Sequence, residues 1–218
     1  MTSLATGRPA ATAHRLVLCA MALERLALTG TARGSARIER IGVGTAAATR
    51  AGRRFVATGP SLIAAVGLCG ALETTLRVGD VIVADEVLDL DTGATYACDR
   101  AASERVTGRR GTLVTAPAPL RTAAERGTAP GIAVDMESAP IACEAARAGI
   151  PFVAIRAVGD TADTELPALV AAIDGASQMR QAVRELRPRD APVLARLAVG
   201  AALGAWALRR ATGELIHG

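Results

Sequence analysis

Lysine is absent from this sequence, and aromatic residues are scarce. All 25 basic residues are arginines, and phenylalanine, tyrosine and tryptophan together make up 2% of the 218 residues. The core must therefore be built from alanine, valine, leucine and isoleucine, in a chain that is 50% hydrophobic. The net charge is only +4, and the arginines are scattered without interleaved aromatics. A nucleic-acid interface is therefore not predicted.

Clustered metal ligands are lacking as well. The four cysteines stand far apart, without a C-x-x-C pair: Cys19, Cys69, Cys98 and Cys143. The two histidines lie near the chain ends, so no zinc site is predicted. We expect reduced, mostly buried thiols in a cytoplasmic protein. The first apolar run, residues 16–23, is short and leads into Glu24 without the usual cleavage site, so no signal peptide is predicted.

Apolar segments typical of strands alternate with helical segments along most of the chain. Strands are predicted at residues 15–21, 36–44, 61–72, 78–90, 110–116, 131–135 and 151–158. Helices are predicted at residues 45–58, 120–125 and 136–148, and residues 92–97 are expected to form a hairpin with the strand before them. This alternation predicts one α/β domain with a largely parallel or mixed sheet.

Chemically distinctive residues follow several of these strands. Glu24 follows the first, the turn Gly42-Val43-Gly44 the second, Met136 and Glu137 the strand at 131–135, and Asp160 the last. Because ligands bind at the carboxyl ends of strands in α/β sheets, the three carboxylates are candidates for one site. Each also has an ordinary interpretation, since Glu137 could complement a helix dipole, Asp160 could cap a helix and Glu24 could lie on the surface.

The stretch VDMESAPIACEAARAGIPFVAIRAVGDTAD, residues 134–163, resembles the signature of the purine nucleoside phosphorylase superfamily. Within it, the chain looks most like the 5′-methylthioadenosine/S-adenosylhomocysteine nucleosidase branch, and CAMALE, GVGTAAA and VGLCGALETTLRVGDVIVAD support this. The resemblance implies a three-layer sandwich with a central mixed sheet flanked by helices. It also implies a homo-oligomer, no cofactor, and a small-molecule or lipid-linked nucleoside as the ligand.

The family chemistry implied by this resemblance is cleavage of the bond between a ribose and a purine, through an oxocarbenium-like transition state. Asp160 would protonate the departing base, which requires a carboxyl kept protonated in a poorly solvated pocket. Glu24 would act as general base on the attacking water. Glu137 would accept hydrogen bonds from the ribose hydroxyls. The other implied binding residues are Met136, Gly44, Gly67 and Leu68, with Phe152 as a candidate for stacking on the purine.

Departures from the family pattern bear on the nucleophile. Phosphorolytic members carry an arginine and a serine where Ala65 and Leu68 stand here, and neither side chain binds an anion. Hydrolysis is therefore favoured, while phosphate remains open as a co-substrate through backbone amides near Gly44 or through Arg156. Gly159 replaces a usual serine. The segment between residues 80 and 135 is shorter than in the nucleosidases, which implies a more open site.

The end of the chain is strongly apolar. We divide the chain into a loose tail at 1–13, a nucleoside phosphorylase-like catalytic domain at 14–188 and an apolar C-terminal helix at 189–218. The run from Leu197 to Leu208 has 12 residues, fewer than the roughly 20 that span a bilayer. The helix is expected either to pack on the sheet or a dimer interface, or to lie at a membrane surface with Trp206 among the headgroups.

This apolar tail, the compact central region and the stretch LPALVAAIDG resemble the hopanoid-associated phosphorylases. For that subgroup the implied reaction converts adenosylhopane into ribosylhopane with release of adenine. The alternatives are a soluble methylthioadenosine/S-adenosylhomocysteine nucleosidase or purine nucleoside phosphorylase, and a non-catalytic module that binds a nucleoside or lipid. A futalosine-type hydrolase is a further possibility, although that branch tends to carry an amide at the position of Asp160.

Overall fold

The computed structural model describes residues 14–32, 34–167 and 190–218. The predicted tail and most of the LPALVAAIDG stretch lie outside these residues. The strands are β1 (Arg15–Cys19), β2 (Ala36–Arg40), β3 (Leu62–Ala71), β4 (Val81–Asp89), β5 (Thr95–Ala97), β6 (Arg109–Thr115), β7 (Ala133–Asp135) and β8 (Phe152–Asp160). The helices are α1 (Ala22–Leu28), α2 (Thr45–Val56), α3 (Arg100–Ser103), α4 (Ala123–Thr128), α5 (Ser138–Arg147) and α7 (Ala191–His217).

The eight strands form one mixed sheet that partly closes on itself. Its order is β2-β1-β3-β7-β6-β4-β5, and β8 pairs parallel with β3 and antiparallel with β4. Strands β3, β8, β4, β6 and β7 therefore form a closed ring, from which β1 and β2 extend. The predicted mixed sheet flanked by helices is confirmed, as is the hairpin of β4 and β5. Two short helices, α1 and α3, were not predicted.

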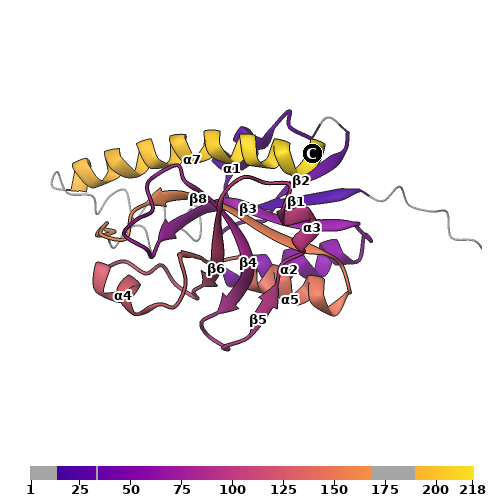
Figure 1. The fold of residues 1–218 in the computed structure, drawn as a ribbon, viewed down its shortest axis with the longest axis horizontal. Coiled ribbons are helices and arrows are strands. Elements are labelled where there is room, and N and C mark those ends of the chain that lie inside the picture. The colour runs from indigo at the N-terminus through magenta and orange to yellow at the C-terminus, as the bar shows by residue number, and fades with distance from the viewer. Residues whose placement is uncertain (1–13, 33, 168–189) are drawn as a thin grey trace, which may run out of the picture.

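Helices cover both faces of the sheet, α1 and α7 on one and α2 and α5 on the other (Figure 1). Strand β3 shows how the sequence builds this arrangement, because its successive residues point to opposite faces. Ile63 and Ala65 pack in the cluster under α2 and α5, whereas Ala64 and Val66 pack in the cluster under α7. Buried alanines in place of aromatics let the helices lie close to the sheet.

All four cysteines are free thiols in this fold. Cys19 and Cys69 are buried, and Cys98 is half-buried. Burial raises the pKa of Cys19 to about 12 and that of Cys98 to about 11, so these side chains remain protonated at neutral pH.

Helix α7 packs against β8 through two glycines. A Cβ atom at Gly200 would overlap the carbonyl oxygen of Gly159, and one at Gly204 would overlap the side chain of Leu68. Both glycines are buried, whereas Gly213, further along α7, faces open space. The helix backbone thus lies directly against the residue that precedes Asp160.

Gly200→Ala is expected to lower the free energy of unfolding by about 1–3 kcal/mol, because the added methyl group meets backbone that cannot move independently. Gly213→Ala is the matched control and is expected to raise it by up to about 1 kcal/mol, since alanine is the better helix former. Urea titrations followed by circular dichroism measure both. Equal stability of Gly200→Ala and the wild type would contradict the close packing of α7 on β8.

Candidate active site

Glu24 is anchored at the carboxyl end of β1. It lies in the first turn of α1 and its side chain is held in the interior, with the residue only 2% exposed. One carboxylate oxygen accepts hydrogen bonds from the amides of Ala20 (2.9 Å) and Met21 (2.8 Å), and the other accepts one from Leu68 (2.8 Å). Burial raises the pKa of Glu24, and the three amides oppose this by favouring the carboxylate. The alternative interpretation of Glu24 as a surface residue is therefore wrong.

Arg156 belongs to β8, where it lies opposite Gly67 of β3 and beside Glu24. A Cβ atom at Gly67 would overlap the Arg156 guanidinium and lie 2.8 Å from Glu24 Oε1, so both charged groups contact the space that this glycine leaves. The other end of the guanidinium pairs with Asp135 (2.5 Å) and donates to Ser138 Oγ (2.8 Å). A fully buried arginine thus balances the surrounding carboxylates.

Glu137 joins this group from the start of α5. Its carboxylate accepts a hydrogen bond of 2.7 Å from the amide of Gly44, the residue that precedes α2. Glu137 occupies the N-cap position of α5 but makes no capping hydrogen bond there, so its side chain reaches across to a different helix. Burial, together with the nearby charge of Asp135, raises the pKa of Glu137 to about 7. Met136, immediately before it, is half-buried.

Asp160 ends β8 and pairs with a buried arginine. In the sheet it lies opposite Gly70 of β3, where the pairing is shifted by a bulge. Its carboxylate forms an ion pair with Arg126 of α4, a side chain that is 2% exposed. Arg126 also donates to the carbonyl oxygens of Leu120 (3.0 Å) and Thr161 (2.6 Å), which fix its position. Burial raises the pKa of Asp160, and Arg126 opposes that rise.

A cavity of about 630 Å³ opens beside Asp160. One side is formed by Gly159, Asp160 and the residues that follow, and the other by apolar side chains of α7, among them Val199 and Leu203. This volume suits a nucleoside-sized ligand. Glu24 and Asp160 contact β3 at Gly67 and Gly70, three residues apart, which corresponds to about 10 Å along a strand.

The structure brings most of the predicted site residues to neighbouring strand ends. One group of contacting residues is Glu24, Gly67 and Leu68, and a second is Gly44 and Glu137. Asp160 lies at the end of β8, opposite Gly70 of β3. Leu68 contributes its backbone amide to Glu24 and directs its side chain toward Gly204 of α7. Phe152 is not brought to this site. It begins β8 at the opposite end from Asp160 and packs in the core.

Several charged residues of the site were not predicted from the sequence: Arg126, Asp135 and the role of Arg156 beside Glu24. For Arg156 a signal existed, because a charged residue inside the apolar segment PFVAIRAV requires a buried partner. Arg126 gave no such signal. It stands in a short polar segment and meets Asp160, 34 residues away, only through the fold.

The carboxylates Glu24, Glu137 and Asp160 thus follow strands of one partly closed mixed sheet. The family model described as Phosphorylase superfamily matches residues 20–108 and 94–197, and the chain belongs to that family. A curated relative, 5′-methylthioadenosine/S-adenosylhomocysteine nucleosidase from Marinomonas sp. (strain MWYL1), is 33% identical over 138 residues. That alignment spans 50% of this chain and 60% of the relative.

Solved structures share the fold over nearly the whole chain. Futalosine hydrolase of Helicobacter pylori superposes with a TM-score of 0.72 at 12% identity, covering 94% of this chain and 97% of that one. The 5′-methylthioadenosine/S-adenosylhomocysteine nucleosidase of Neisseria meningitidis, in complex with methylthio-immucillin-A, gives 0.68 at 21% identity, covering 94% and 98%. These likenesses establish the fold, and the predicted nucleoside phosphorylase-like architecture is confirmed.

Proposed function

We propose that this protein cleaves the N-glycosidic bond of a 5′-substituted adenosine with water, releasing adenine. The observation that carries the proposal is a pair of carboxylates, buried Glu24 and half-buried Asp160, at the ends of two strands, β1 and β8, that flank β3. Glu24 is held by three amides beside Arg156, and Asp160 borders an apolar cavity. A hydrolytic cleavage of this kind needs one carboxylate that accepts a proton and one carboxyl that donates one.

In the proposed reaction, water attacks C1′ of the ribose as the bond from C1′ to the purine breaks. Glu24 takes a proton from the water, and Asp160 gives a proton to N7 of the departing adenine. The products are adenine and a 5′-substituted ribose. Glu137 holds the ribose hydroxyls while positive charge develops on the sugar, and Met136 packs beside it. Burial raises the pKa of Glu24, while the amides of Met21 and Leu68 and then the Arg156 guanidinium favour its carboxylate form.

Water is favoured over phosphate because the candidate phosphate ligands already have partners. The amide of Gly44 donates to Glu137, and Arg156 is engaged by Asp135 and Ser138. Ala65 and Leu68 offer no anion-binding side chain. A phosphate dianion would also approach several buried carboxylates, which repel it.

For the substrate we propose a lipid-linked adenosine, adenosylhopane, converted to ribosylhopane by an enzyme of the cytoplasm that meets the inner membrane face. The proposal is supported by the apolar side chains of α7 that line the cavity beside Asp160, because they suit an apolar 5′ substituent. A homo-oligomer is proposed from the family resemblance alone. The soluble alternative, 5′-methylthioadenosine or S-adenosylhomocysteine, is the substrate named for the Marinomonas relative.

Adenine release in phosphate-free buffer tests the substrate directly. We expect an adenosine with a long alkyl chain at the 5′ carbon to be cleaved with a higher kcat/KM than 5′-methylthioadenosine. A preference for methylthioadenosine would favour a soluble nucleosidase. If neither compound releases adenine, even after phosphate is added, a non-catalytic nucleoside-binding module becomes the better interpretation.

Arg126→Gln is expected to move the alkaline limb of the pH profile of kcat/KM to higher pH. Burial raises the pKa of Asp160 and Arg126 opposes it, so without the guanidinium the carboxyl keeps its proton to higher pH. The protonated acid is the active form, and activity is lost as the pH rises through its pKa. Arg121→Gln, on a partly buried neighbour that does not pair with Asp160, is the control. An unchanged alkaline limb would contradict Asp160 as the titrating acid.

A further inference from the structure

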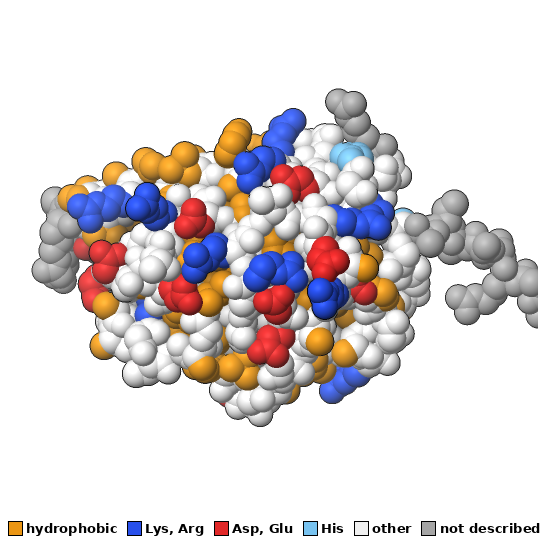
Figure 2. Space-filling model, viewed as in Figure 1, with side chains coloured by type: hydrophobic (Ala, Val, Ile, Leu, Met, Phe, Trp, Pro, Cys, Tyr) orange, Lys and Arg blue, Asp and Glu red, His pale blue; other side chains and the backbone are white. Residues whose placement is uncertain are grey.

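All exposed large hydrophobic side chains of the described residues lie on two helices. They are Leu23 and Leu26 on α1, and Val199, Leu203 and Trp206 on α7. The two helices pack against each other on the same face of the sheet. In Figure 2, hydrophobic side chains follow the top edge of the molecule over α7. We call these five side chains and the surface between them the α1–α7 face.

The spacing on α7 places its three exposed side chains in one stripe. Val199, Leu203 and Trp206 follow each other at intervals of four and three residues, so they lie on one side of the helix. The opposite side is buried against the sheet through residues such as Leu208 and Leu215. Helix α7 is long and apolar enough to cross a membrane, with a mean hydropathy of 1.6 over its most apolar window. Because its other side forms part of the core, it is placed to lie along a bilayer surface.

The exposed charges on α1 and α7 themselves are of one sign, whereas Asp163 and Glu165 add negative charge at the cavity beside Val199 and Leu203. Exposed positions on α1 and α7 include Arg25, Arg209 and Arg210, and none of the exposed residues of these helices is acidic. Glu24 is buried, and Glu214 is half-buried and engaged by Arg210 and the amide of Thr107. Arg25 and Arg209 make no ion pair with the residues that the structure describes. An apolar stripe edged by unpaired arginines and an exposed tryptophan is complementary to anionic headgroups above acyl chains.

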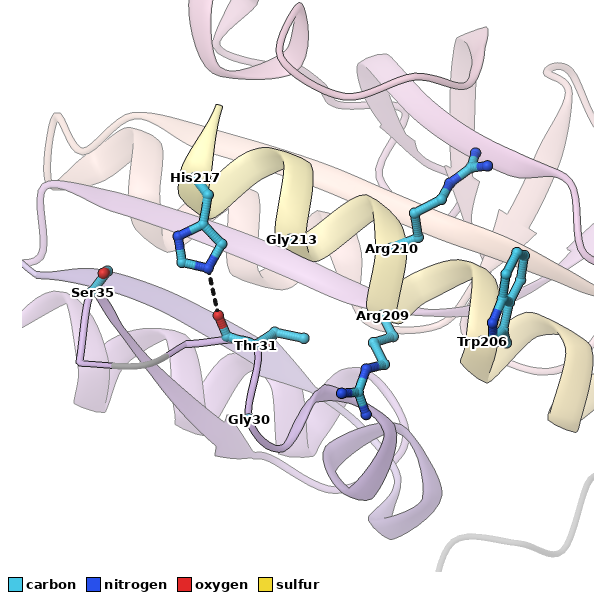
Figure 3. A pocket seen from close by; sticks show the side chains of 8 residues that line it. All are labelled: Gly30, Thr31, Ser35, Trp206, Arg209, Arg210, Gly213 and His217. Atoms are coloured by element: carbon cyan, nitrogen blue, oxygen red, sulfur yellow. Dashed lines mark hydrogen bonds between the residues drawn. The ribbon is translucent and has the colours of Figure 1, made fainter.

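A groove of about 780 Å³ lies beside this stripe, between the C-terminal half of α7 and the loop after α1. Figure 3 shows Arg209 pointing from α7 toward that loop near Gly30, with Trp206 one turn earlier. His217 closes the far end through a contact of 2.9 Å with the carbonyl oxygen of Thr31. The groove is thus lined by the Arg209 guanidinium, which can bind a lipid phosphate, and by Trp206, which is 67% exposed.

From these observations we propose that the α1–α7 face docks on an anionic phospholipid bilayer, with Arg209 on a headgroup phosphate and Trp206 and Leu203 at the acyl boundary. The same helices border the candidate active site. Glu24 is on the buried side of α1, and Val199 and Leu203 also line the cavity beside Asp160. Docking therefore brings the cavity next to the bilayer. This last step rests on the proposed function, whereas docking itself does not.

Sedimentation of the full-length protein with vesicles tests the docking. Vesicles made from equal parts of phosphatidylcholine and phosphatidylglycerol are expected to carry the protein down, and vesicles of phosphatidylcholine alone are expected to do so much less. Arg209→Gln should weaken binding to the anionic vesicles about fivefold, the loss that corresponds to one arginine at a charged surface. Trp206→Ser should weaken binding to both kinds. Arg50→Gln, an exposed arginine of α2 on the opposite face, should bind like the wild type.

Circular dichroism checks that the variants fold, and all three substituted side chains are exposed, so unfolding is not expected. Absence of binding to anionic vesicles would overturn the proposal, as would equal binding of Trp206→Ser and the wild type. A wild-type dimer that Trp206→Ser converts to a monomer would assign the face to a second copy of the chain and also overturn it. None of these readouts involves catalysis. Failure of adenine release would leave a positive docking result standing.

Discussion

Asp160→Asn is expected to lower kcat for adenine release by about 10²–10⁴-fold, the usual contribution of a general acid. The amide has nearly the same shape as the carboxyl but cannot give a proton to N7 of the departing base. Burial raises the pKa of Asp160, which favours the protonated form that the reaction needs. The measurement is single-turnover release of adenine from 5′-methylthioadenosine or its long-chain analogue.

Asp85→Asn provides a matched control for this substitution. Asp85 also pairs with an arginine, Arg110, but on the surface and away from the site, so its loss should leave kcat unchanged. The loss of charge at Asp160 also leaves Arg126 buried without its carboxylate partner, so some loss of stability is expected. Thermal unfolding separates that loss from the loss of activity. An Asp160→Asn enzyme with near wild-type kcat would remove this residue as the acid.

Glu24→Gln has the second large expected effect, a loss of hydrolysis of about 10²–10⁴-fold, because an amide cannot take a proton from water. The geometry adds a stability effect. Both carboxylate oxygens of Glu24 accept hydrogen bonds from backbone amides, so the NH₂ group of glutamine must face at least one donor. That mismatch is expected to cost about 1–3 kcal/mol of the free energy of unfolding.

The control for Glu24→Gln is Glu39→Gln, which replaces the half-buried partner of exposed Arg37 and should change neither activity nor stability appreciably. Rates are measured with and without added phosphate. Hydrolysis that survives in Glu24→Gln would contradict its role as general base. Activity that returns only with phosphate would instead identify phosphate as the nucleophile.

The strand ends were predictable because the strands themselves were. Buried strands such as β3 and β8 are recognisable as apolar runs, and residues that follow such runs in an α/β sheet meet at one edge. Glu24, Glu137 and Asp160 were predicted on that basis. Their hydrogen-bond donors were not, because a backbone amide such as that of Leu68 carries no signal in the sequence.

Ion pairs between residues that are far apart in the sequence could not be predicted. Arg126 and Asp160 meet only because α4 returns to the end of β8, and no local pattern records that contact. Phe152 illustrates the opposite error. An aromatic residue near the acid in sequence lies at the far end of a nine-residue strand, since an extended chain separates its two ends by about 3.3 Å per residue.

The apolar tail was predicted either to pack on the domain or to face a membrane, and α7 has a surface suited to each. Its buried side carries glycine, alanine and leucine against β8, while Val199, Leu203 and Trp206 are exposed. The helix is longer than the apolar run because Pro192 is compatible with its first turn and the sequence continues without a break to His217. An apolar stretch of sequence alone does not show which side of the helix is buried.

The most direct test of the account is the fate of the ribose when wild-type enzyme acts on 5′-methylthioadenosine in phosphate-free, heavy-oxygen water. We predict release of adenine together with 5-methylthioribose that carries one heavy oxygen at C1. Because the anomeric oxygen of a free sugar also exchanges with the solvent, the decisive part of that result is free 5-methylthioribose formed without phosphate, which identifies water as the nucleophile and the chain as a nucleosidase. Adenine release that requires added phosphate and yields the ribose 1-phosphate would contradict the account.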